Sequence, residues 1–363
     1  MAGENAADIL NRLGDRWKGI IERAANLDPL KTEGESKDTF RVKSLQPLGQ
    51  SYEQAERLRK QLLKEYKDKK IEDVFSGREV GIEGAACYQI QSHSPLDLNV
   101  VNRDTVKERL LSNLKLLYGI GNITEEKLKG LGYATIPDLT GHPKYGHEAQ
   151  RFLGVVGNGN INELGDWIRR WFSGSHPLAF FCSSFHDTGD MVILDIETMG
   201  LSPDTPIILL GAAYIDGPNI IVKQYLVRNI EEEVAVLKMF LSHVNLNSFL
   251  VTFNGKSFDL PYIKARMAYY GVRAQLDLPH YDMLYFSRNA WRDRVPDCRL
   301  TTLEEYLFGV TREDDVPSEL VPSFYETYLK SKNIGPLVPI IEHNRQDLIT
   351  LVRIFSLLHE EWK

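Results

Sequence analysis

Acidic residues occupy three places in the second half of this chain where the surrounding residues are apolar. Asp195 and Glu197 stand within and directly after the apolar run 192–196. Asp259 follows a second apolar run, and Asp347 lies in an apolar stripe closer to the C-terminus. Burying an ionised carboxylate costs several kcal/mol or more unless a positive group meets it. If the fold brings these four carboxylates together, divalent cations are the simplest way to neutralise them.

The apolar pattern from residue 191 onward alternates between strands and helices. Apolar and β-branched runs predict strands at 192–196, 207–215, 220–227 and 249–253. Helical spacing predicts helices over 231–244, 258–270 and 340–359. Three successive strands followed by a helix, a strand and further helices predict an α/β fold with a mixed sheet flanked by helices.

The length of 363 residues exceeds the usual limit for a single core, so two or three domains are expected. Residues 1–100 are predicted to form a small α+β region of unknown role. Its expected elements are helices at 6–28 and 52–70, a polar linker at 31–50 and a hairpin at 80–91. Residues 101–175 are predicted to form an all-helical domain, and residues 186–363 the α/β domain.

Composition excludes several classes of protein. No apolar run reaches the ~18 residues of a membrane span, and the N-terminal residues lack the features of a secretory signal. Three scattered cysteines, Cys87, Cys182 and Cys298, form no CxxC pair, which predicts a reducing, cytoplasmic setting without disulfides or a zinc knuckle. The formal net charge is −7, and residues 173–363 alone carry −8. The acidity therefore lies in the segment that holds the carboxylates.

The spacing of the acidic residues suggests how they could meet. Asp195 and Glu197 are two residues apart in a predicted strand, so both side chains point to one face. Asp259 stands in the first turn of a predicted helix, where the helix dipole favours a negative charge. His343 and Asp347 are four apart on a helix and share a face. Each motif alone also has a structural explanation, as a solvated strand edge, a helix cap or a surface contact. Their order along the chain favours one shared site.

These motifs resemble those of the DEDD superfamily of 3′-to-5′ exonucleases, which have a ribonuclease-H-like fold. Asp195 and Glu197 match the first motif, Asn254 and Asp259 the second, and Asp347 the third. Further residues resemble the predicted bacterial exonuclease branch of the YprB type: Asp282-Met-Leu, Arg288-x-x-Trp291, Cys298-x-Leu300 and Arg312-x-x-Asp315-Val-Pro. The resemblance covers roughly residues 190–363.

The resemblance implies hydrolysis with two divalent cations, Mg²⁺ or Mn²⁺, held by the four carboxylates Asp195, Glu197, Asp259 and Asp347. His343 would take the proton of the attacking water. It stands four residues before the last aspartate, a spacing typical of members with tyrosine there, so its orientation as a base is left open. Contacts with the substrate are assigned to Thr198, Asn254 and Phe258.

Residues 117–133 resemble a helix-hairpin-helix module, which binds nucleic-acid backbones without regard to sequence. Gly119 and Gly121 permit a tight turn, and free amides at the start of the next helix can hold a phosphate. Glu125 departs from the small apolar residue that the family has at this position. A helical connector that only packs against the rest of the protein is the alternative.

Together the sequence predicts a metal-dependent 3′-to-5′ exonuclease whose partner is nucleic acid, DNA favoured over RNA, with no membrane association. Two alternatives stay open: a nucleic-acid-binding or scaffold protein without catalytic activity, and an endonuclease built on the same fold. The retention of all four acidic ligands argues against the first alternative.

Overall fold

The protein is described here from a computed structural model, which describes residues 48–312 and 316–363. The helix predicted at 6–28 and most of the linker predicted at 31–50 lie outside the described residues. The last three linker residues belong instead to helix α2 (Leu48–Glu65). This helix also ends earlier than the predicted 52–70, and Asp68 just beyond it has a positive φ of 64°.

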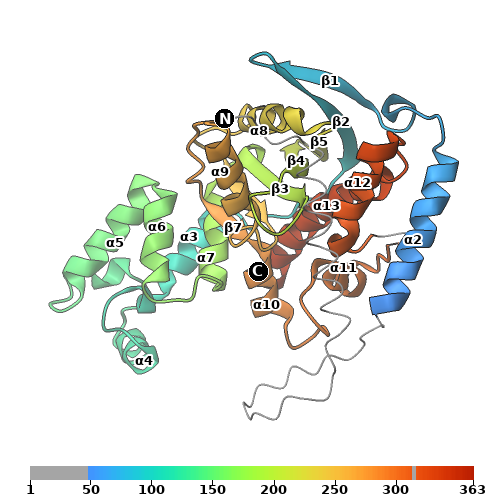
Figure 1. Ribbon diagram of the computed structural model, residues 1–363. Coiled ribbons are helices and arrows are strands. Elements are labelled where there is room, and N and C mark those ends of the chain that lie inside the picture. The colour runs from blue at the N-terminus through green and yellow to red at the C-terminus, as the bar shows by residue number, and fades with distance from the viewer. Residues whose placement is uncertain (1–47, 313–315) are drawn as a thin grey trace, which may run out of the picture.

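A mixed seven-stranded sheet forms the centre of the molecule (Figure 1). Its spatial order is β1-β2-β5-β4-β3-β6-β7. The strands are β1 (Gly77–Ile82), β2 (Ala85–Pro95), β3 (Met191–Thr198), β4 (Ile207–Asp216), β5 (Asn219–Leu226), β6 (Phe249–Thr252) and β7 (His280–Asp282). The β1 to β3 half is antiparallel, whereas β6 runs parallel to β3 and to β7. The predicted α/β class with a mixed sheet is confirmed.

Helices cover both faces of this sheet. On one face, Ile193 of β3 shares a core with Leu348 and Leu351 of the long helix α13 (Leu337–Glu361). On the other face, Val192 and Leu194 pack with residues of α8 (Glu233–Leu241) and α9 (Asp259–Tyr269). Because side chains alternate along a strand, odd-numbered residues of β3 face α13. That alternation directs Asp195 and Glu197 toward α13.

The predicted hairpin exists, but it belongs to the sheet rather than to a separate N-terminal region. Strand β2 pairs antiparallel with β5 over eight residues, from Tyr88 opposite Leu226 to Pro95 opposite Asn219. Tyr88 and Ile90 are buried in a core that also contains Leu226. Pairing with β2 satisfies the outer main-chain groups of β5, which would otherwise form an exposed sheet edge. The expectation of a separate small α+β region is therefore wrong for the hairpin.

Residues 103–181 form short helices beside the sheet, as predicted for residues 105–172 (Figure 1). They comprise α3 (Arg103–Ser112), α4 (Asn122–Gly130), α5 (Gly146–Asn158), α6 (Ile161–Arg169) and α7 (Pro177–Phe181), with 3₁₀ turns between them. Phe152, Trp167 and Phe180 share one continuous core with Phe355 of α13. The helical region therefore packs directly on the helix that carries the third acidic motif.

Four helices and one strand were not predicted from the sequence. They are β7, α7, α10 (Met283–Trp291), α11 (Leu300–Phe308) and α12 (Val321–Ser331). The cysteines Cys87, Cys182 and Cys298 are unbridged, as predicted. Among the described residues, no helix combines the length and apolar character that crossing a bilayer requires.

Candidate active site

One pocket of about 330 Å³ gathers eight of the ten residues that the sequence nominates for the site. It lies where the end of β3, the start of α9 and the middle of α13 meet. Among its lining residues are Asp195, Glu197, Thr198, Asn254, Phe258, Asp259, His343 and Asp347. The three acidic motifs, spread over about 150 residues of chain, therefore converge as the sequence predicts.

Strand β3 delivers the first two carboxylates. Asp195 is half-buried, and Glu197 is 7% exposed. The ladder between β3 and β4 shifts register between Glu197 and Thr198, which ends regular pairing beside the pocket. Thr198 then donates from its hydroxyl to the carbonyl of Gly200 at 2.7 Å. This bond fixes the sharp exit of the chain from the site.

The second motif forms a turn between β6 and α9. Asn254 has a left-handed backbone with φ 63° and is exposed at the pocket rim. Asp259 begins α9 and accepts a hydrogen bond from the backbone amide of Ile196 at 3.1 Å, which ties it to β3. Buried Asp282 holds the turn by accepting from the amides of Asn254 at 2.7 Å and Lys256 at 3.0 Å. Asp282 is thus a structural carboxylate.

Helix α13 contributes His343 and Asp347. The Nε2 atom of His343 lies 3.3 Å from Oδ2 of Asp347 and 4.0 Å from Oε1 of Glu197. The imidazole therefore faces the carboxylates, as an i,i+4 pair on one helical face requires. The four-residue spacing between His343 and Asp347, which left the orientation of His343 open in the sequence, thus places the ring in the pocket.

Asn344 is a site residue that sequence analysis missed. It is fully buried, and its amide nitrogen donates to Oδ2 of Asp195 at 2.7 Å and to the Asp195 carbonyl at 3.1 Å. Gln224 of β5 in turn donates to the Asn344 side-chain oxygen at 2.9 Å. An amide on the apolar stripe of a helix was the available signal, because a buried amide needs polar partners.

Arg312 is the second missed residue. Its guanidinium donates to Oδ1 of Asp347, to Oε2 of Glu304 at 2.6 Å and to Nδ1 of His343 at 3.3 Å. The Glu304 side chain is completely buried in α11 and also accepts from Thr350 at 2.7 Å. Arginine cannot accept a hydrogen bond, so Nδ1 of His343 is the acceptor and Nε2 carries the proton of a neutral ring.

The electrostatics of the pocket disfavour ionised carboxyl groups without a counter-charge. Burial raises the pKa of Asp259 to about 7. Burial, followed by the charges of Asp347, Asp259 and Glu197, raises the pKa of Asp195 well above its usual value. Shifts of this kind are typical of functional sites, although structural networks also produce them. The pocket therefore lacks positive charge, even with Arg312 present.

Divalent cations fit the chemistry of the donors but not their present arrangement. Carboxylate oxygens suit Mg²⁺ or Mn²⁺, and burial together with the charges of the neighbouring carboxylates raises the pKa of Asp195, which a bound cation would oppose. Within residues 48–312 and 316–363, however, no three His, Cys, Asp or Glu side chains stand close enough together to hold a metal ion. Asp195 is engaged by Asn344, and Asp347 by Arg312. Arg312 therefore occupies one oxygen of Asp347 and would compete with a cation for this carboxylate.

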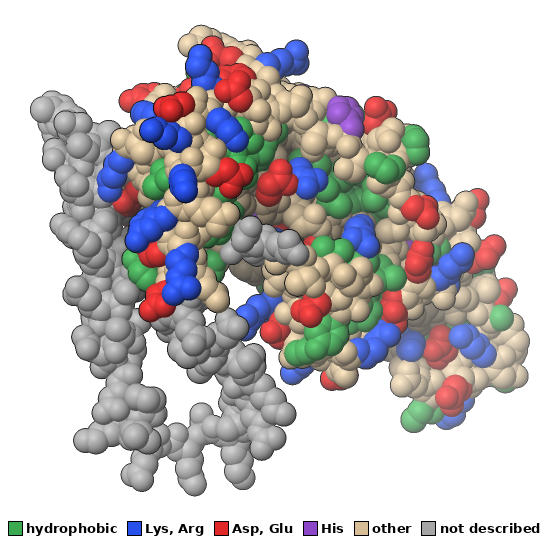
Figure 2. Space-filling view, turned by 90° about the vertical axis from the view of Figure 1, so that its right-hand side faces the viewer, with side chains coloured by type: hydrophobic (Ala, Val, Ile, Leu, Met, Phe, Trp, Pro, Cys, Tyr) green, Lys and Arg blue, Asp and Glu red, His purple; other side chains and the backbone are tan. Residues whose placement is uncertain are grey.

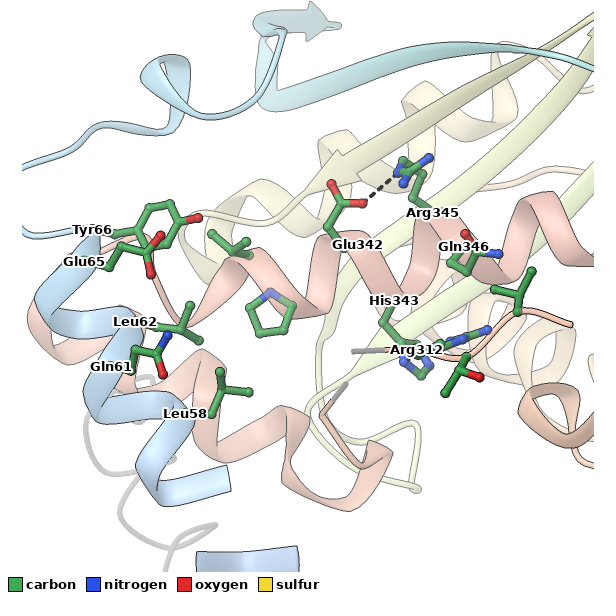
Figure 3. Close-up of a pocket in the computed structure, with 14 residues that line it drawn as sticks. Leu58, Gln61, Leu62, Glu65, Tyr66, Arg312, Glu342, His343, Arg345 and Gln346 are labelled. Carbon is green, nitrogen blue, oxygen red and sulfur yellow. Dashed lines mark hydrogen bonds and ion pairs between the residues drawn. The ribbon is translucent and has the colours of Figure 1, made fainter. Parts of the chain in front are cut away.

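A second pocket, of about 340 Å³, adjoins the first and shares His343 with it (Figure 3). It lies between α2 and α13. Leu62 of α2, Tyr66 directly after α2 and Arg345 of α13 are among its lining residues. Arg312 and His343 lie side by side in this view (Figure 3). His343 therefore borders both pockets, and Arg312 lines the second one.

The two glycines of the hairpin lie outside the carboxylate pocket. Gly119 adopts a left-handed conformation with φ 78°, and Gly121 directly precedes α4. Glu125 turns inward, where it accepts from the amide of Leu114 at 3.2 Å and pairs with Lys129 at 3.0 Å. Binding of a phosphate at this turn stays a prediction.

Comparison with known proteins agrees with this geometry. Residues 192–359 match the sequence profile of the RNase_H superfamily. This part of the chain is an RNase H-like domain. The chain is also 31% identical over 204 residues to the uncharacterized protein YprB of Bacillus subtilis (strain 168), a match over 54% of this chain and 48% of YprB. The chain thus spans about half the length of the relative it matches. All eight predicted site residues that line the carboxylate pocket lie inside the RNase H-like domain.

Proposed function

We propose that the RNase H-like domain hydrolyses phosphodiester bonds of nucleic acid from the 3′ end, with DNA favoured over RNA. The observation that carries this proposal is the convergence of Asp195, Glu197, Asp259 and Asp347 on one pocket. Domains of this superfamily often act on nucleic acids, and the ordered motifs resemble those of 3′-to-5′ exonucleases. The hairpin at Gly119 and Gly121 favours DNA.

The residues of the pocket have distinct roles in this proposal. Two divalent cations, when bound by the four carboxylates, supply an activated water and stabilise the charge on the leaving oxygen. Asn344 holds the Asp195 carboxylate in place through its 2.7 Å hydrogen bond. Asn254 and Phe258 line the pocket beside the carboxylates and would position the terminal nucleotide. Base stacking on Phe258 suits binding without sequence preference.

His343 is the proposed proton acceptor, and its present contacts set a condition on that role. With Nδ1 accepting from Arg312, a neutral ring carries its proton on Nε2, which faces Asp347 at 3.3 Å. A base that acts through Nε2 needs that atom unprotonated. For His343 to act as a base through Nε2, Arg312 therefore has to leave Nδ1. The same movement of Arg312 would also release Asp347.

One observation favours a second candidate, a protein that binds nucleic acid without cutting it. The bond from Arg312 to Asp347 neutralises a carboxylate that the cations need. If Arg312 keeps this place when the substrate binds, the domain recognises nucleic acid but does not hydrolyse it. The same assay separates the two candidates, and it also detects internal cutting.

The test uses the full chain with 5′-labelled single- and double-stranded DNA and RNA, in Mg²⁺, Mn²⁺ or EDTA. The proposal predicts a ladder of products shortened from the 3′ end, strongest on DNA and absent in EDTA. Asp195→Asn and Asp259→Asn should abolish the ladder, since each removes one ligand charge without changing shape. Asp216→Asn is the matched control, because Asp216 is an exposed acid at the end of β4.

The outcomes discriminate among the candidates. Binding without cation-dependent cleavage would support the non-catalytic alternative, and internal cuts would support an endonuclease. A ladder that persists in Asp195→Asn would show that a contaminating nuclease, rather than this pocket, produces it. Equal loss in Asp216→Asn would point to a general effect of charge rather than to the pocket.

A further inference from the structure

The helical region and the RNase H-like domain together enclose a cavity that the proposed chemistry does not use. It has a volume of about 270 Å³. Helix α6 contributes Arg169, the neighbouring α7 contributes Ala179, and the segment at β7 contributes His280 and Tyr281. Lys256, from the turn between β6 and α9, completes the wall. In Figure 1, α6 and α7 lie on the side of the molecule where β7 ends the sheet.

Two like charges meet at this cavity. The positive charge of Arg169, after burial, is a cause of the lowered pKa of Lys256, so the two cations are close enough to repel each other. Arg169 pairs with Asp166 at 2.6 Å, and its side chain remains 53% exposed. Within the described part of the chain, the Lys256 ammonium forms no ion pair; the charge of buried Asp282 acts on it but does not offset burial and Arg169, so the pKa of Lys256 remains lowered. An anion bound in the cavity would relieve the repulsion between the two cations.

The remaining lining is neutral. Burial, with the charges of nearby lysines, lowers the pKa of His280 to about 3, so its ring is uncharged at neutral pH. His280 hydrogen-bonds to the Thr252 hydroxyl at 2.7 Å. Ala179 and buried Cys182 supply apolar floor. A low-dielectric wall strengthens the attraction of the two cations for an anionic group.

The cavity and the carboxylate pocket lie on two sides of the β6–α9 turn. Asn254, Phe258 and Asp259 of the β6–α9 turn line the carboxylate pocket, whereas Lys256 of the same turn lines the cavity. Buried Asp282 holds both sides, since it accepts from the amides of Asn254 and Lys256. An extended molecule that enters the carboxylate pocket could therefore reach the cavity by crossing a single turn.

We propose that this cavity binds a backbone phosphate of the nucleic-acid strand whose 3′ end lies in the carboxylate pocket. The Arg169 guanidinium offers forked donors to phosphate oxygens, and Lys256 adds a point charge. The contact positions the strand without reading its sequence. It also gives α6 of the helical region a part in substrate binding. This inference rests on the proposed function.

The face that carries α2 offers no comparable concentration of positive charge. There, in the part that the structure describes, Lys and Arg side chains are interspersed with Asp and Glu side chains (Figure 2). The ion pairs of this face include Arg57 with Glu53 and Arg59 with Glu56. Each of these two arginines has its own carboxylate, whereas the cavity holds two cations, Arg169 and Lys256, of which only Arg169 forms an ion pair among the described residues. The cavity is therefore the better place for a phosphate.

The test is binding of fluorescent single-stranded DNA to the full chain in EDTA, where cleavage cannot occur. The double variant Lys256→Gln/Arg169→Gln should weaken binding about tenfold, the equivalent of one charge-assisted hydrogen bond. The slope of log Kd against log salt should fall by about 0.7, the value for one phosphate of a single strand. Oligonucleotides too short to cross the turn should bind both proteins equally.

The matched control is Lys264→Gln/Arg170→Gln, which removes the same charge from positions close by, inside α9 and at the end of α6. Lys264 is exposed and paired with Asp277, and Arg170 lies over Trp167; neither lines the cavity. Equal loss of affinity in control and cavity variants would overturn the inference, because charge alone would then explain it. Circular dichroism and Tm establish that both double variants fold.

Failure of this inference differs from failure of the proposed function. If the native protein binds DNA and cuts it from the 3′ end while the cavity variant binds like the native protein at every length and salt concentration, only the cavity proposal is wrong. If the native protein neither binds nor cuts nucleic acid, the proposed function is wrong and the cavity proposal falls with it.

Discussion

Asn344 forms two hydrogen bonds with Asp195: its side-chain nitrogen donates to the Asp195 carboxylate at 2.7 Å and to the Asp195 main-chain carbonyl at 3.1 Å. The space for this amide comes from β4, where Gly211 stands directly opposite Asp195 in the ladder. A Cβ atom built on Gly211 would lie 2.1 Å from the Asn344 side-chain oxygen. The orientation of the first carboxylate thus depends on the absence of a side chain on the neighbouring strand.

Gly211→Ala tests this dependence. The new methyl group must displace Asn344, which breaks its hydrogen bonds to Asp195 and to Gln224. Overpacking of this kind typically costs about 1–3 kcal/mol, so the midpoint of urea unfolding should fall. We expect cleavage to fall by more than tenfold, because Asp195 loses its position as a ligand.

Gly154→Ala provides the control for that substitution. Gly154 lies inside α5, and an added Cβ would have no atom within 4 Å. Alanine is favoured over glycine in a helix by roughly 1 kcal/mol. This variant should therefore be slightly more stable and fully active. Native-like activity of Gly211→Ala would show that Asn344 does not need its observed position.

The convergence of the acidic motifs was predictable from local pattern. The two-residue spacing of Asp195 and Glu197 places both on one face of a strand, and apolar flanks require that strand to be buried. The four-residue spacing of His343 and Asp347 gives a shared helical face in the same way. Each element supplies a direction, and a central sheet leaves few places where these directions can meet.

The partners of those carboxylates were not predictable by the same means. Arg312 and Asp347 are 35 residues apart, and Asn344 and Asp195 are 149 apart. No periodicity links residues across such separations. The packing of α13 on β3 brings Asn344 to Asp195, and the packing of α11 on α13 brings the segment that holds Arg312 to Asp347. The pairing of β2 with β5 escaped for the same reason, although the hairpin itself followed from local β-propensity.

Arg312→Gln tests whether this arginine competes with cations for Asp347. Removal of the guanidinium frees Asp347, so the affinity for Mn²⁺ should rise several-fold in calorimetric titration. It also leaves Glu304 buried without its cationic partner, which typically costs about 3–5 kcal/mol. We therefore expect a protein that melts at lower temperature without Mn²⁺ and gains more stability from it.

The control for Arg312 is Arg345→Gln, which removes a neighbouring cation. Arg345 pairs with Glu342 at 2.8 Å on the exposed side of α13 and touches none of the four carboxylates. It should change neither Mn²⁺ affinity nor Tm appreciably. Unchanged Mn²⁺ binding in Arg312→Gln would contradict the idea that the arginine holds the place of a cation.

The stability of the cation-free protein should depend on pH through Asp259. Burial raises the pKa of this carboxyl to about 7 in the folded protein, against an ordinary value near ~3.9 in the unfolded chain. As pH rises from about 4 to 7, the unfolded chain releases a proton that the folded protein retains, so stability falls. Melting in EDTA should therefore shift to lower temperature across this range.

Asp259→Asn should remove part of that dependence and raise Tm at pH 8, while abolishing cleavage. The amide keeps an oxygen that can accept from Ile196, as the carboxylate does at 3.1 Å. Binding of Mn²⁺ requires the ionised carboxylate, so the cation should stabilise the native protein more at pH 8 than at pH 6. A Tm in EDTA that is equally pH-dependent in both proteins would assign the effect to other groups.

His359 should produce the opposite dependence on pH at the junction of α13 with the helical region. It is 1% exposed, its Nδ1 accepts from the amide of Val101 at 3.3 Å, and its Nε2 meets the Ser183 hydroxyl at 3.1 Å. Burial lowers its pKa to about 3. Below pH ~6.5 the histidine of the unfolded chain binds a proton, whereas the buried ring of the folded protein stays neutral. The free energy of unfolding therefore falls by about 1.4 kcal/mol for each unit by which the pH decreases. Urea unfolding between pH 7.5 and 5 measures this slope.

His359→Gln should flatten this slope relative to the native protein, whereas His147→Gln, at an exposed position of α5, should not. Because Asp259 contributes equally to all three proteins, the difference between their slopes isolates His359. Identical slopes would show that the ring at this junction can be protonated without cost.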